Sequence, residues 1–345
     1  MRDIIKKLSE AHSLTLEEYR LLVEGYSEEN AKILAELAVS ARKEQYSNKV
    51  FIRGLIEISN YCKKNCLYCG IRRDNRDCER YRLEKDEILS CCDEGYALGF
   101  RTFVMQGGED AFYSDDRLCE IISEIKNKYP DCAVTLSLGE RSYDSYKRLY
   151  LAGADRYLLR HETADAEHYS RLHQKELSID TRMTALKNLK DIGYQVGCGF
   201  MVGSPYQTSL TLAKDLKLID DFKPQMCGIG PFIPHKATPF SNESAGSVDF
   251  TCYLLSVIRL IHPKILLPAT TALGSIEENG REKGIMAGAN VVMPNLSPYD
   301  NRKKYELYDN KLFGSAESAQ AIDDLKKRMS AIGYEIVVDR GDAKQ

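Results

Sequence analysis

From Val50 onward, short runs rich in β-branched residues alternate with longer amphipathic runs whose apolar residues recur at helical spacing. This alternation is typical of parallel βα units, in which each strand is followed by a helix that returns across the sheet. The strand candidates span residues 50–59, 101–106, 133–138, 155–162, 194–202, 225–232, 264–270 and 289–294. Because a closed barrel of parallel strands has this number of units, the sequence predicts an α/β fold of the TIM type, a (β/α)8 barrel.

The segment before the first strand has a different pattern. Up to residue 47 it shows only helical patterns, and Thr15 and Glu18 have the spacing of a capping box that opens a helix. No linker rich in proline, glycine or serine divides the remainder, which ends in a helical pattern and a last strand, YEIVVD. We therefore expect an N-terminal helical extension at 1–47 and, at 48–345, the barrel with its C-terminal helix and strand.

The composition excludes several classes of protein. A net charge of −3 and a charged fraction of 29% create no global field that would attract nucleic acid or an anionic membrane. The first residues, MRDIIKKLSE, lack the apolar core of a signal peptide, and no apolar run reaches the ~18 residues of a membrane span. We expect a cytoplasmic protein with no nucleic-acid or membrane partner, whose cysteines are reduced thiols or metal ligands.

Three cysteines lie in the loop that follows the first predicted strand. Cys62, Cys66 and Cys69 have the spacing C-x3-C-x2-C in the segment SNYCKKNCLYCGIRR. In a βα barrel this loop is at the C-terminal end of the strands, where active sites are built. Three thiolates leave a metal cluster one ligand short, and Cys78 is too poorly spaced to complete a zinc site. The three cysteines are therefore predicted to be metal ligands and catalytic residues.

This spacing, with an aromatic residue, Tyr68, before the last cysteine, resembles the signature of the radical S-adenosylmethionine (SAM) superfamily. The resemblance implies a 4Fe-4S cluster whose open iron binds SAM and cleaves it reductively to a 5′-deoxyadenosyl radical. Gln106-Gly107-Gly108-Glu109, at the end of the second predicted strand, resembles the superfamily's GGE motif, where glycine lets the backbone approach a ligand.

The resemblance also implies which residues contact SAM. Arg182 corresponds to an arginine that faces the SAM carboxylate, and Ser137 to a ribose contact. An alternative is that the apolar members of the set only fill the core. The complete predicted set is Tyr68, Gln106, Gly107, Gly108, Glu109, Ser137, Glu162, Arg182, Met201, Met226 and Ile229.

The fourth predicted strand carries unusual charge. Period-2 alternation places Arg156, Arg160 and Glu162 on the same face. If that face lines the barrel, ligands or partners must neutralise the charges, because burying unpaired charge is costly. The alternative, in which the charges face solvent, stays open.

Longer segments, including VMQGGED, GADRYLLRHETAD, GIGPFIPHKATP and LPATTALGS, resemble the FeFe-hydrogenase maturases of the HydE type from about Gln45 onward. This family resemblance implies a role in assembling the diiron subsite of the hydrogenase H-cluster. It also implies an organometallic iron substrate, partner hydrogenase maturases, and a reducing electron donor such as ferredoxin or flavodoxin. The residues that match the substrate end of the family's barrel are Arg53, Arg156, Arg160, Thr270, Thr271, Tyr305 and Tyr308.

One departure from the family and three alternative functions follow from the sequence. Some members hold a second cluster near the C-terminus, whereas this chain has no cysteine after Cys252 and has Phe313 in that region. A mutase of the methylornithine synthase type is an alternative, although the predicted lumen offers mainly arginines. A sulfur insertase like biotin synthase lacks suitable additional cysteines. A non-catalytic Fe-S carrier would need no SAM motifs.

Overall fold

The computed structural model describes residues 1–312 and 318–344, so Phe313 lies outside the described residues. The elements are α1 (Arg2–Ala11), α2 (Leu16–Glu24), α3 (Glu28–Tyr46), β1 (Lys49–Ile52), β2 (Gly54–Ser59), α4 (Lys85–Ala97), β3 (Thr102–Gly107), α5 (Asp115–Lys128), β4 (Ala133–Ser137), α6 (Tyr143–Leu151), β5 (Arg156–Leu158), α7 (Ala166–Leu172), α8 (Ile179–Ile192), β6 (Gln195–Cys198), β7 (Met201–Val202), α9 (Ser209–Phe222), β8 (Met226–Cys227), β9 (Gly230–Pro231), α10 (Val248–Ile261), α11 (Thr271–Ile276), α12 (Gly280–Met286), β10 (Val291–Val292), α13 (Tyr299–Arg302), the 3-10 helix η2 (Ala319–Ala321), α14 (Ile322–Ala331) and β11 (Glu335–Val337).

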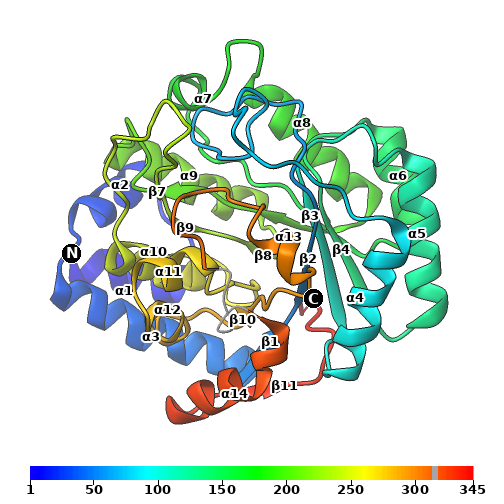
Figure 1. Cartoon of the computed structure of the whole chain (residues 1–345). Helices are drawn as coiled ribbons and strands as arrows, with labels where there is room; N and C mark the ends of the chain where they lie inside the picture. The colour runs from blue at the N-terminus through cyan, green and yellow to red at the C-terminus, as the bar shows by residue number, and fades with distance from the viewer. Residues whose placement is uncertain (313–317, 345) are drawn as a thin grey trace.

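The named strands pair in parallel, as the predicted α/β fold requires. Six strands form the largest sheet in the order β2-β3-β4-β5-β6-β8, and β10-β1-β11 form a second sheet. Isolated bridges from Met226 to Leu266, from Pro268 to Val291 and from Leu55 to Asn295 connect the two sheets. The strands thus follow a TIM-type ring with helices α4, α5, α6 and α8 on its outer side (Figure 1), but no continuous ladder closes it.

Several predicted strands are shorter than expected. The strand predicted at 50–59 is divided at Arg53, whose N–H donates to the carbonyl of Val292 at 3.0 Å, into β1 and β2. The strand predicted at 264–270 is not formed, because only isolated bridges occur there. Pro268 has no N–H for a ladder, which explains part of this difference.

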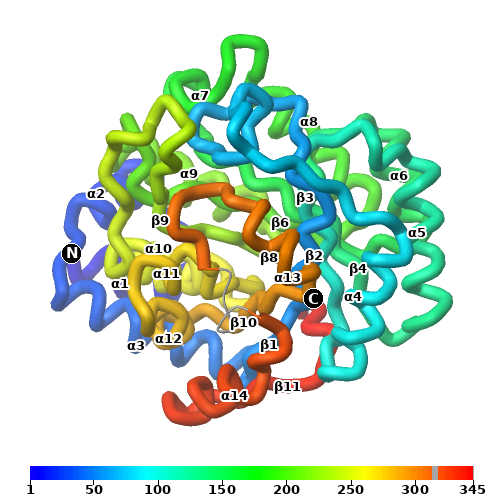
Figure 2. Tube along the Cα trace, in the orientation of Figure 1, coloured from blue at the N-terminus to red at the C-terminus, as the bar shows by residue number. Residues whose placement is uncertain are grey.

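The N-terminal helices pack on the later helices of the barrel. Thr15 caps α2 through the predicted capping box with Glu18. The hydroxyl of Tyr253 on α10 donates to the carbonyl of Leu22 at 2.6 Å, and buried residues of α2 and α10 share the main core. These helices lie at one side of the barrel (Figure 2), while the division at residue 47 stays a prediction.

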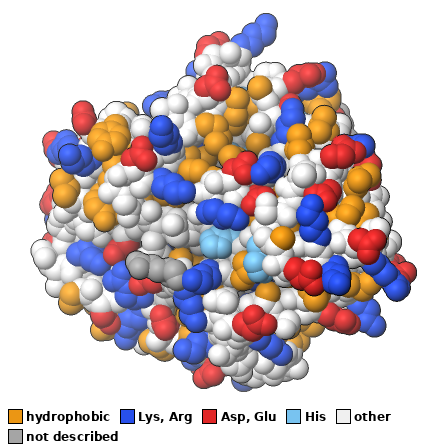
Figure 3. Space-filling model, turned by 180° about the vertical axis from the view of Figure 1, so that it is seen from behind, with side chains coloured by type: hydrophobic (Ala, Val, Ile, Leu, Met, Phe, Trp, Pro, Cys, Tyr) orange, Lys and Arg blue, Asp and Glu red, His pale blue; other side chains and the backbone are white. Residues whose placement is uncertain are grey.

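Alternate residues of the large sheet face opposite sides, one toward the helices and one toward the barrel interior. Phe103, Val134 and Tyr157 belong to the apolar core between the sheet and the helices. Their neighbours in sequence therefore face the barrel interior. No helix among the described residues is long and apolar enough to cross a membrane. On the face shown in Figure 3, basic and acidic side chains are interspersed.

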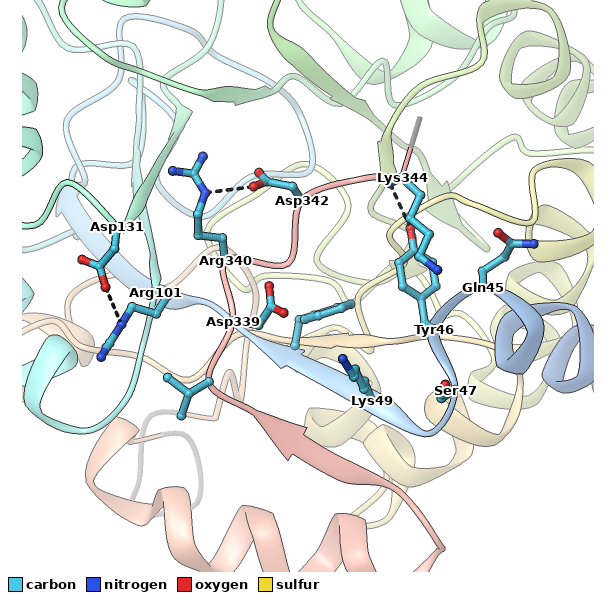
Figure 4. Close-up of a pocket in the computed structure, with 12 residues that line it drawn as sticks. Gln45, Tyr46, Ser47, Lys49, Arg101, Asp131, Asp339, Arg340, Asp342 and Lys344 are labelled. Carbon is cyan, nitrogen blue, oxygen red and sulfur yellow. Dashed lines mark hydrogen bonds and ion pairs between the residues drawn. The ribbon is translucent and has the colours of Figure 1, made fainter.

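The C-terminal tail after β11 covers the N-terminal ends of the strands. The carboxylate of Asp342 lies 2.5 Å from the Arg156 guanidinium at the start of β5, and it accepts from the Gln195 amide at 2.9 Å. Arg340 pairs with Asp342 at 2.8 Å beside a pocket of about 530 Å³ (Figure 4). The tail is thus fastened to the end of the barrel opposite the cysteine loop.

Candidate active site

The three cysteines lie together in the loop after β2, and their thiols are free. Burial, together with the charge of Cys62, raises the pKa of Cys66 to about 12, and burial likewise raises the pKa of Cys62 and of Cys69. Such thiols ionise when a cationic metal centre binds them, because the metal compensates their charge. Three thiols that are close enough to raise the pKa of one another fit the ligand set of an iron–sulfur cluster. Within residues 1–312 and 318–344, no group of three or more His, Cys, Asp or Glu has the geometry to bind a single metal ion.

Backbone contacts from three directions hold this loop. The N–H of Glu109 donates to the Cys62 sulfur at 3.4 Å. The N–H of Leu67 donates to the carbonyl of Leu172 at the end of α7, at 3.0 Å, so the blue loop in Figure 2 runs up to α7. The N–H of Gly70 donates to the carbonyl of Leu307 at 2.8 Å. The cysteine loop is therefore fixed to the segment after β3, to the end of α7 and to the segment after α13.

Gly108 lies close against the backbone of the cysteine loop. A Cβ atom at this position would lie 2.2 Å from the carbonyl oxygen of Tyr61 and 2.6 Å from Cβ of Cys62. Both neighbours belong to the cysteine loop, so a side chain here would displace the loop backbone. The glycine of the QGGE segment thus shapes the cysteine loop.

We expect Gly108→Ala to lower the iron bound per chain after reconstitution and to destabilise the protein by about 1–3 kcal/mol, the usual cost of overpacking. Iron analysis and urea unfolding measure the two effects. Gly228→Ala is the matched control, because its added Cβ would meet only a Pro268 side-chain carbon at 3.8 Å. Equal iron content in both variants would contradict this role of Gly108.

A charged network lies beside the loop. Arg182 donates to the Glu140 carboxylate at 2.7 Å and also donates to the carbonyl of Arg160. Burial alone would raise the pKa of Glu140, but Arg182 and Lys64 lower it below its ordinary value. Glu109 accepts from the N–H of Glu140 at 3.0 Å. Arg182 is therefore a fixed cation paired with the Glu140 carboxylate.

Arg160 and Glu162 follow β5 and approach each other. Their side chains lie 3.1 Å apart, with Arg160 one-third exposed. The two atoms of this ion pair, Arg160 Nη2 and Glu162 Oε2, make no hydrogen bond within the described part of the chain, and neither does Arg160 Nε. Glu162 has φ of 65°, a conformation unfavourable for residues with a side chain. Because strained, incompletely bonded charges are typical of binding sites, this pair is a candidate ligand contact.

A buried pair of ionisable side chains, His161 and Asp215, lies next to Glu162, which His161 directly precedes in the chain. His161 Nε2 lies 3.2 Å from the Asp215 carboxylate, and both side chains are fully buried. The N–H of Gly199 approaches the other ring nitrogen at 3.3 Å. His161 thus faces the helices, opposite to its two charged neighbours, as the predicted alternation requires.

A second buried network reaches the barrel interior. Lys311 lies 2.5 Å from the Glu57 carboxylate and donates to the carbonyl of Tyr305 at 2.8 Å. The amide of Asn295 also donates to Glu57, at 2.9 Å, and the Gln106 amide reaches the Tyr305 hydroxyl at 3.4 Å. Glu57 and Lys311 hold the segment after α13 to the inner face of β2.

The structure divides the remaining predicted residues between two ends of the barrel. Met201 packs in a cluster with Tyr68 near the cysteine loop, while Met226 contacts the Arg53 guanidinium at 2.9 Å. Arg53 and Arg156 lie toward the tail. Ile229 packs in the core with residues of the helices.

The other predicted residues lie at strand ends. Ser137 ends β4 opposite Gln106. The hydroxyl of Thr270 has no hydrogen-bond partner in residues 1–312 or 318–344 and lies close to Gly230. Thr271 begins α11, and Tyr308 lies in the segment after α13.

Known proteins are similar to this chain over most of its length. The Radical SAM superfamily matches residues 56–219. The FeFe-hydrogenase maturase subunit HydE of Thermotoga maritima is 39% identical over 344 residues, which cover 100% of this chain and 98% of that protein. The 3-methylornithine synthase of Methanosarcina acetivorans is 28% identical over 96% of this chain and 92% of that protein.

Two crystal structures are similar to the whole chain. Methylornithine synthase (PylB) superposes with a TM-score of 0.84 at 27% identity, covering 97% of each chain. HydG, a maturase of the FeFe-hydrogenase, superposes with a TM-score of 0.79 at 21% identity, covering 96% of this chain and 74% of that chain. The likeness to HydG concerns the fold alone.

Proposed function

This chain belongs to the HydE-type FeFe-hydrogenase maturases of the radical SAM superfamily, and we propose that it acts on an anionic iron complex during assembly of the H-cluster diiron subsite. As a member of this superfamily it is an enzyme that uses a 4Fe-4S cluster and SAM. Its substrate is a small molecule, and it works with other maturases. The proposed source of the substrate is a partner maturase that makes its carbon monoxide and cyanide ligands.

The residues near the cysteine loop fit the cofactors. Cys62, Cys66 and Cys69 would hold the cluster. When bound, the cluster and SAM supply a 5′-deoxyadenosyl radical by one-electron cleavage of the sulfonium. Arg182, a buried cation, would bind the SAM carboxylate. Glu162 would accept a hydroxyl of the nucleoside, because its Oε2 makes no hydrogen bond within residues 1–312 and 318–344 besides its ion pair with Arg160, and a carboxylate oxygen can accept more than one bond.

The observation that carries the choice of substrate is the incomplete bonding of two arginines. Nε and Nη2 of Arg53, and Nε of Arg160, are buried without a hydrogen-bond partner in the described residues, and Arg160 Nη2 has only its ion pair with Glu162 Oε2, at 3.1 Å. Burial and the nearby Arg156 lower the pKa of Arg53 well below its ordinary value. An anion at the cysteine-loop end of the lumen would supply acceptors and compensating charge to Arg160, while Arg53, toward the tail, adds positive charge at the other end of the same lumen. An ammonium substrate would add to the positive charge.

The test is an anaerobic assay of the reconstituted protein with SAM and dithionite, with 5′-deoxyadenosine measured by chromatography. We expect the cysteine-bound iron carbonyl cyanide complex to stimulate SAM cleavage strongly, and Arg160→Ala to raise the concentration needed at least about tenfold, since a charged hydrogen bond is worth about 1.5–3 kcal/mol. Arg171→Ala, which removes an exposed arginine of α7, is the control.

A lysine mutase is the second candidate, because the methylornithine synthase structure has the TM-score of 0.84. In the same assay a mutase would be indifferent to the iron complex and would convert lysine to a rearranged amino acid. That result would replace the maturase proposal.

A further inference from the structure

The carboxylate of Asp215, on α9, contacts the chain on both sides of Glu162. Its Oδ1 accepts from the Ala164 N–H at 2.5 Å and lies 3.2 Å from Nε2 of His161. The side chains of Asp215 and His161 are both fully buried. One oxygen atom thus bridges the residue before Glu162 and the second residue after it.

The ring of His161 is oriented by a contact on its other side. The N–H of Gly199 donates to Nδ1 at 3.3 Å, so this nitrogen presents its lone pair. In the neutral ring the proton is therefore on Nε2, which faces Asp215. Nε2 makes no hydrogen bond in the described residues, so its 3.2 Å contact with Asp215 is an electrostatic attraction.

Glu162, between these contacts, has a backbone conformation that needs support from its surroundings. Its φ of 65° lies in the left-handed region, which is unfavourable for a residue with a side chain. Its own N–H donates to the carbonyl of Gly199 at 3.0 Å. Such a conformation persists only where neighbouring contacts determine it, and Asp215 supplies contacts on both sides of it.

The carboxylate of Asp215 is costly to bury. Its Oδ2 has no hydrogen-bond partner within residues 1–312 and 318–344, and burial raises the pKa of Asp215 above its ordinary value. Its neighbours on the buried face of α9 include Leu212, Leu216 and Ile219, so an apolar residue would pack there at lower cost. The two contacts of Oδ1 are what the carboxylate provides in return.

These contacts matter because the backbone conformation of Glu162 determines where its side chain lies. The Glu162 carboxylate is 3.1 Å from Arg160 Nη2 and only 11% exposed. If φ of Glu162 relaxed to a negative value, the direction of its Cα–Cβ bond would change and the carboxylate would move from this position.

We propose that Asp215 and His161 are positioning residues, which hold Glu162 in its left-handed conformation and so place its carboxylate for the binding of SAM. This inference rests on the proposed function, which assigns Glu162 to SAM, but not on the identity of the iron substrate.

The test is the dissociation constant of SAM, measured by equilibrium dialysis on the reconstituted protein without a reductant. We expect Glu162→Ala to raise this constant about tenfold or more, the effect of losing a hydrogen bond to a charged group. Asp215→Leu, which removes both contacts of Oδ1, should raise it by a similar factor. Asp215→Asn, whose amide oxygen can take the place of Oδ1, should bind SAM nearly as tightly as the parent.

A double variant distinguishes positioning from general damage to the fold. If Asp215 acts through Glu162, Asp215→Leu should add nothing to the loss of affinity in Glu162→Ala. Asp220→Leu is the control on the same helix, because the buried Asp220 carboxylate accepts from the hydroxyls of Ser13 at 2.7 Å and Tyr19 at 3.1 Å. It should lower the stability to urea and leave SAM binding unchanged.

His161→Phe, which removes the other side of the contact, takes the place of Asp215→Leu in these comparisons if that variant does not fold. Three results would overturn the inference: parent-like SAM binding in the folded variant, losses that add in the double variant, or binding by Asp215→Asn as weak as that by Asp215→Leu. Parent-like binding by Glu162→Ala would instead refute the role of Glu162 in the proposed function, and this inference with it.

Discussion

Replacing Cys66 by alanine is expected to reduce reconstituted iron to background and to abolish SAM cleavage, while the circular dichroism spectrum stays that of the parent. Two remaining thiolates cannot hold a cluster that needs three protein ligands. Cys66 is only half-buried and lies in a loop fixed by its backbone, so its truncation leaves no cavity in the main core. Iron analysis, the absorption of the reconstituted protein and 5′-deoxyadenosine production measure these effects.

Cys78→Ala is the matched control for this variant. Cys78 is also half-buried and free, and it lies nine residues after Cys69 against the amide of Asn60, at 3.5 Å. We expect this variant to keep its iron and its activity. Retention of the cluster in Cys66→Ala, or its loss in both variants, would refute the assignment of the ligands.

The features that could be predicted from the sequence are local in the chain. The spacing of Cys62, Cys66 and Cys69 is a property of one loop, and the capping box of Thr15 and Glu18 belongs to one helix turn. The alternation of strands and helices predicted the α/β fold for the same reason. Each signal needs only a few consecutive residues.

The support of the site depends on contacts between distant segments and was missed. Glu140 reaches Arg182 from a loop 42 residues earlier, and His173 reaches Tyr68 across 105 residues. Glu57 did carry a signal, because an acidic residue inside an apolar strand must have a partner. Nothing near it in the sequence identifies Lys311 as that partner.

Strand alternation predicted that Arg156 and Arg160 share a face of the strand, but it did not predict how far apart they lie along the barrel. Four residues of extended chain span about 13 Å, which separates two side chains on the same face. Arg156 therefore meets the C-terminal tail, while Arg160 lies next to Glu162. Only the path of the tail, which depends on the complete fold, determines that Asp342 neutralises Arg156.

Replacing Asp342 by alanine is expected to destabilise the folded protein by about 2–3 kcal/mol at pH 7. Arg156 is fully buried, and removal of its carboxylate partner leaves a buried charge poorly compensated. The expected cost is at the lower end of the usual range because the Asp342 side chain is 39% exposed and solvent screens the pair. Urea unfolding of the parent and the variant measures the difference.

The same pair predicts how this difference depends on pH. Burial alone would raise the pKa of Asp342, but Arg156 and Arg340 hold it below its ordinary value. A carboxylate whose pKa is lowered by folding stabilises the protein above its unfolded pKa of about 3.9, and this stabilisation is lost as the pH falls further. The difference in unfolding free energy between the parent and Asp342→Ala should therefore be constant from pH 7 to 5 and become smaller below about pH 4. Asp339→Ala, which removes an exposed carboxylate of the same tail, should cost much less. A gap that stays unchanged at low pH would mean that the carboxylate charge of Asp342 is not what stabilises Arg156.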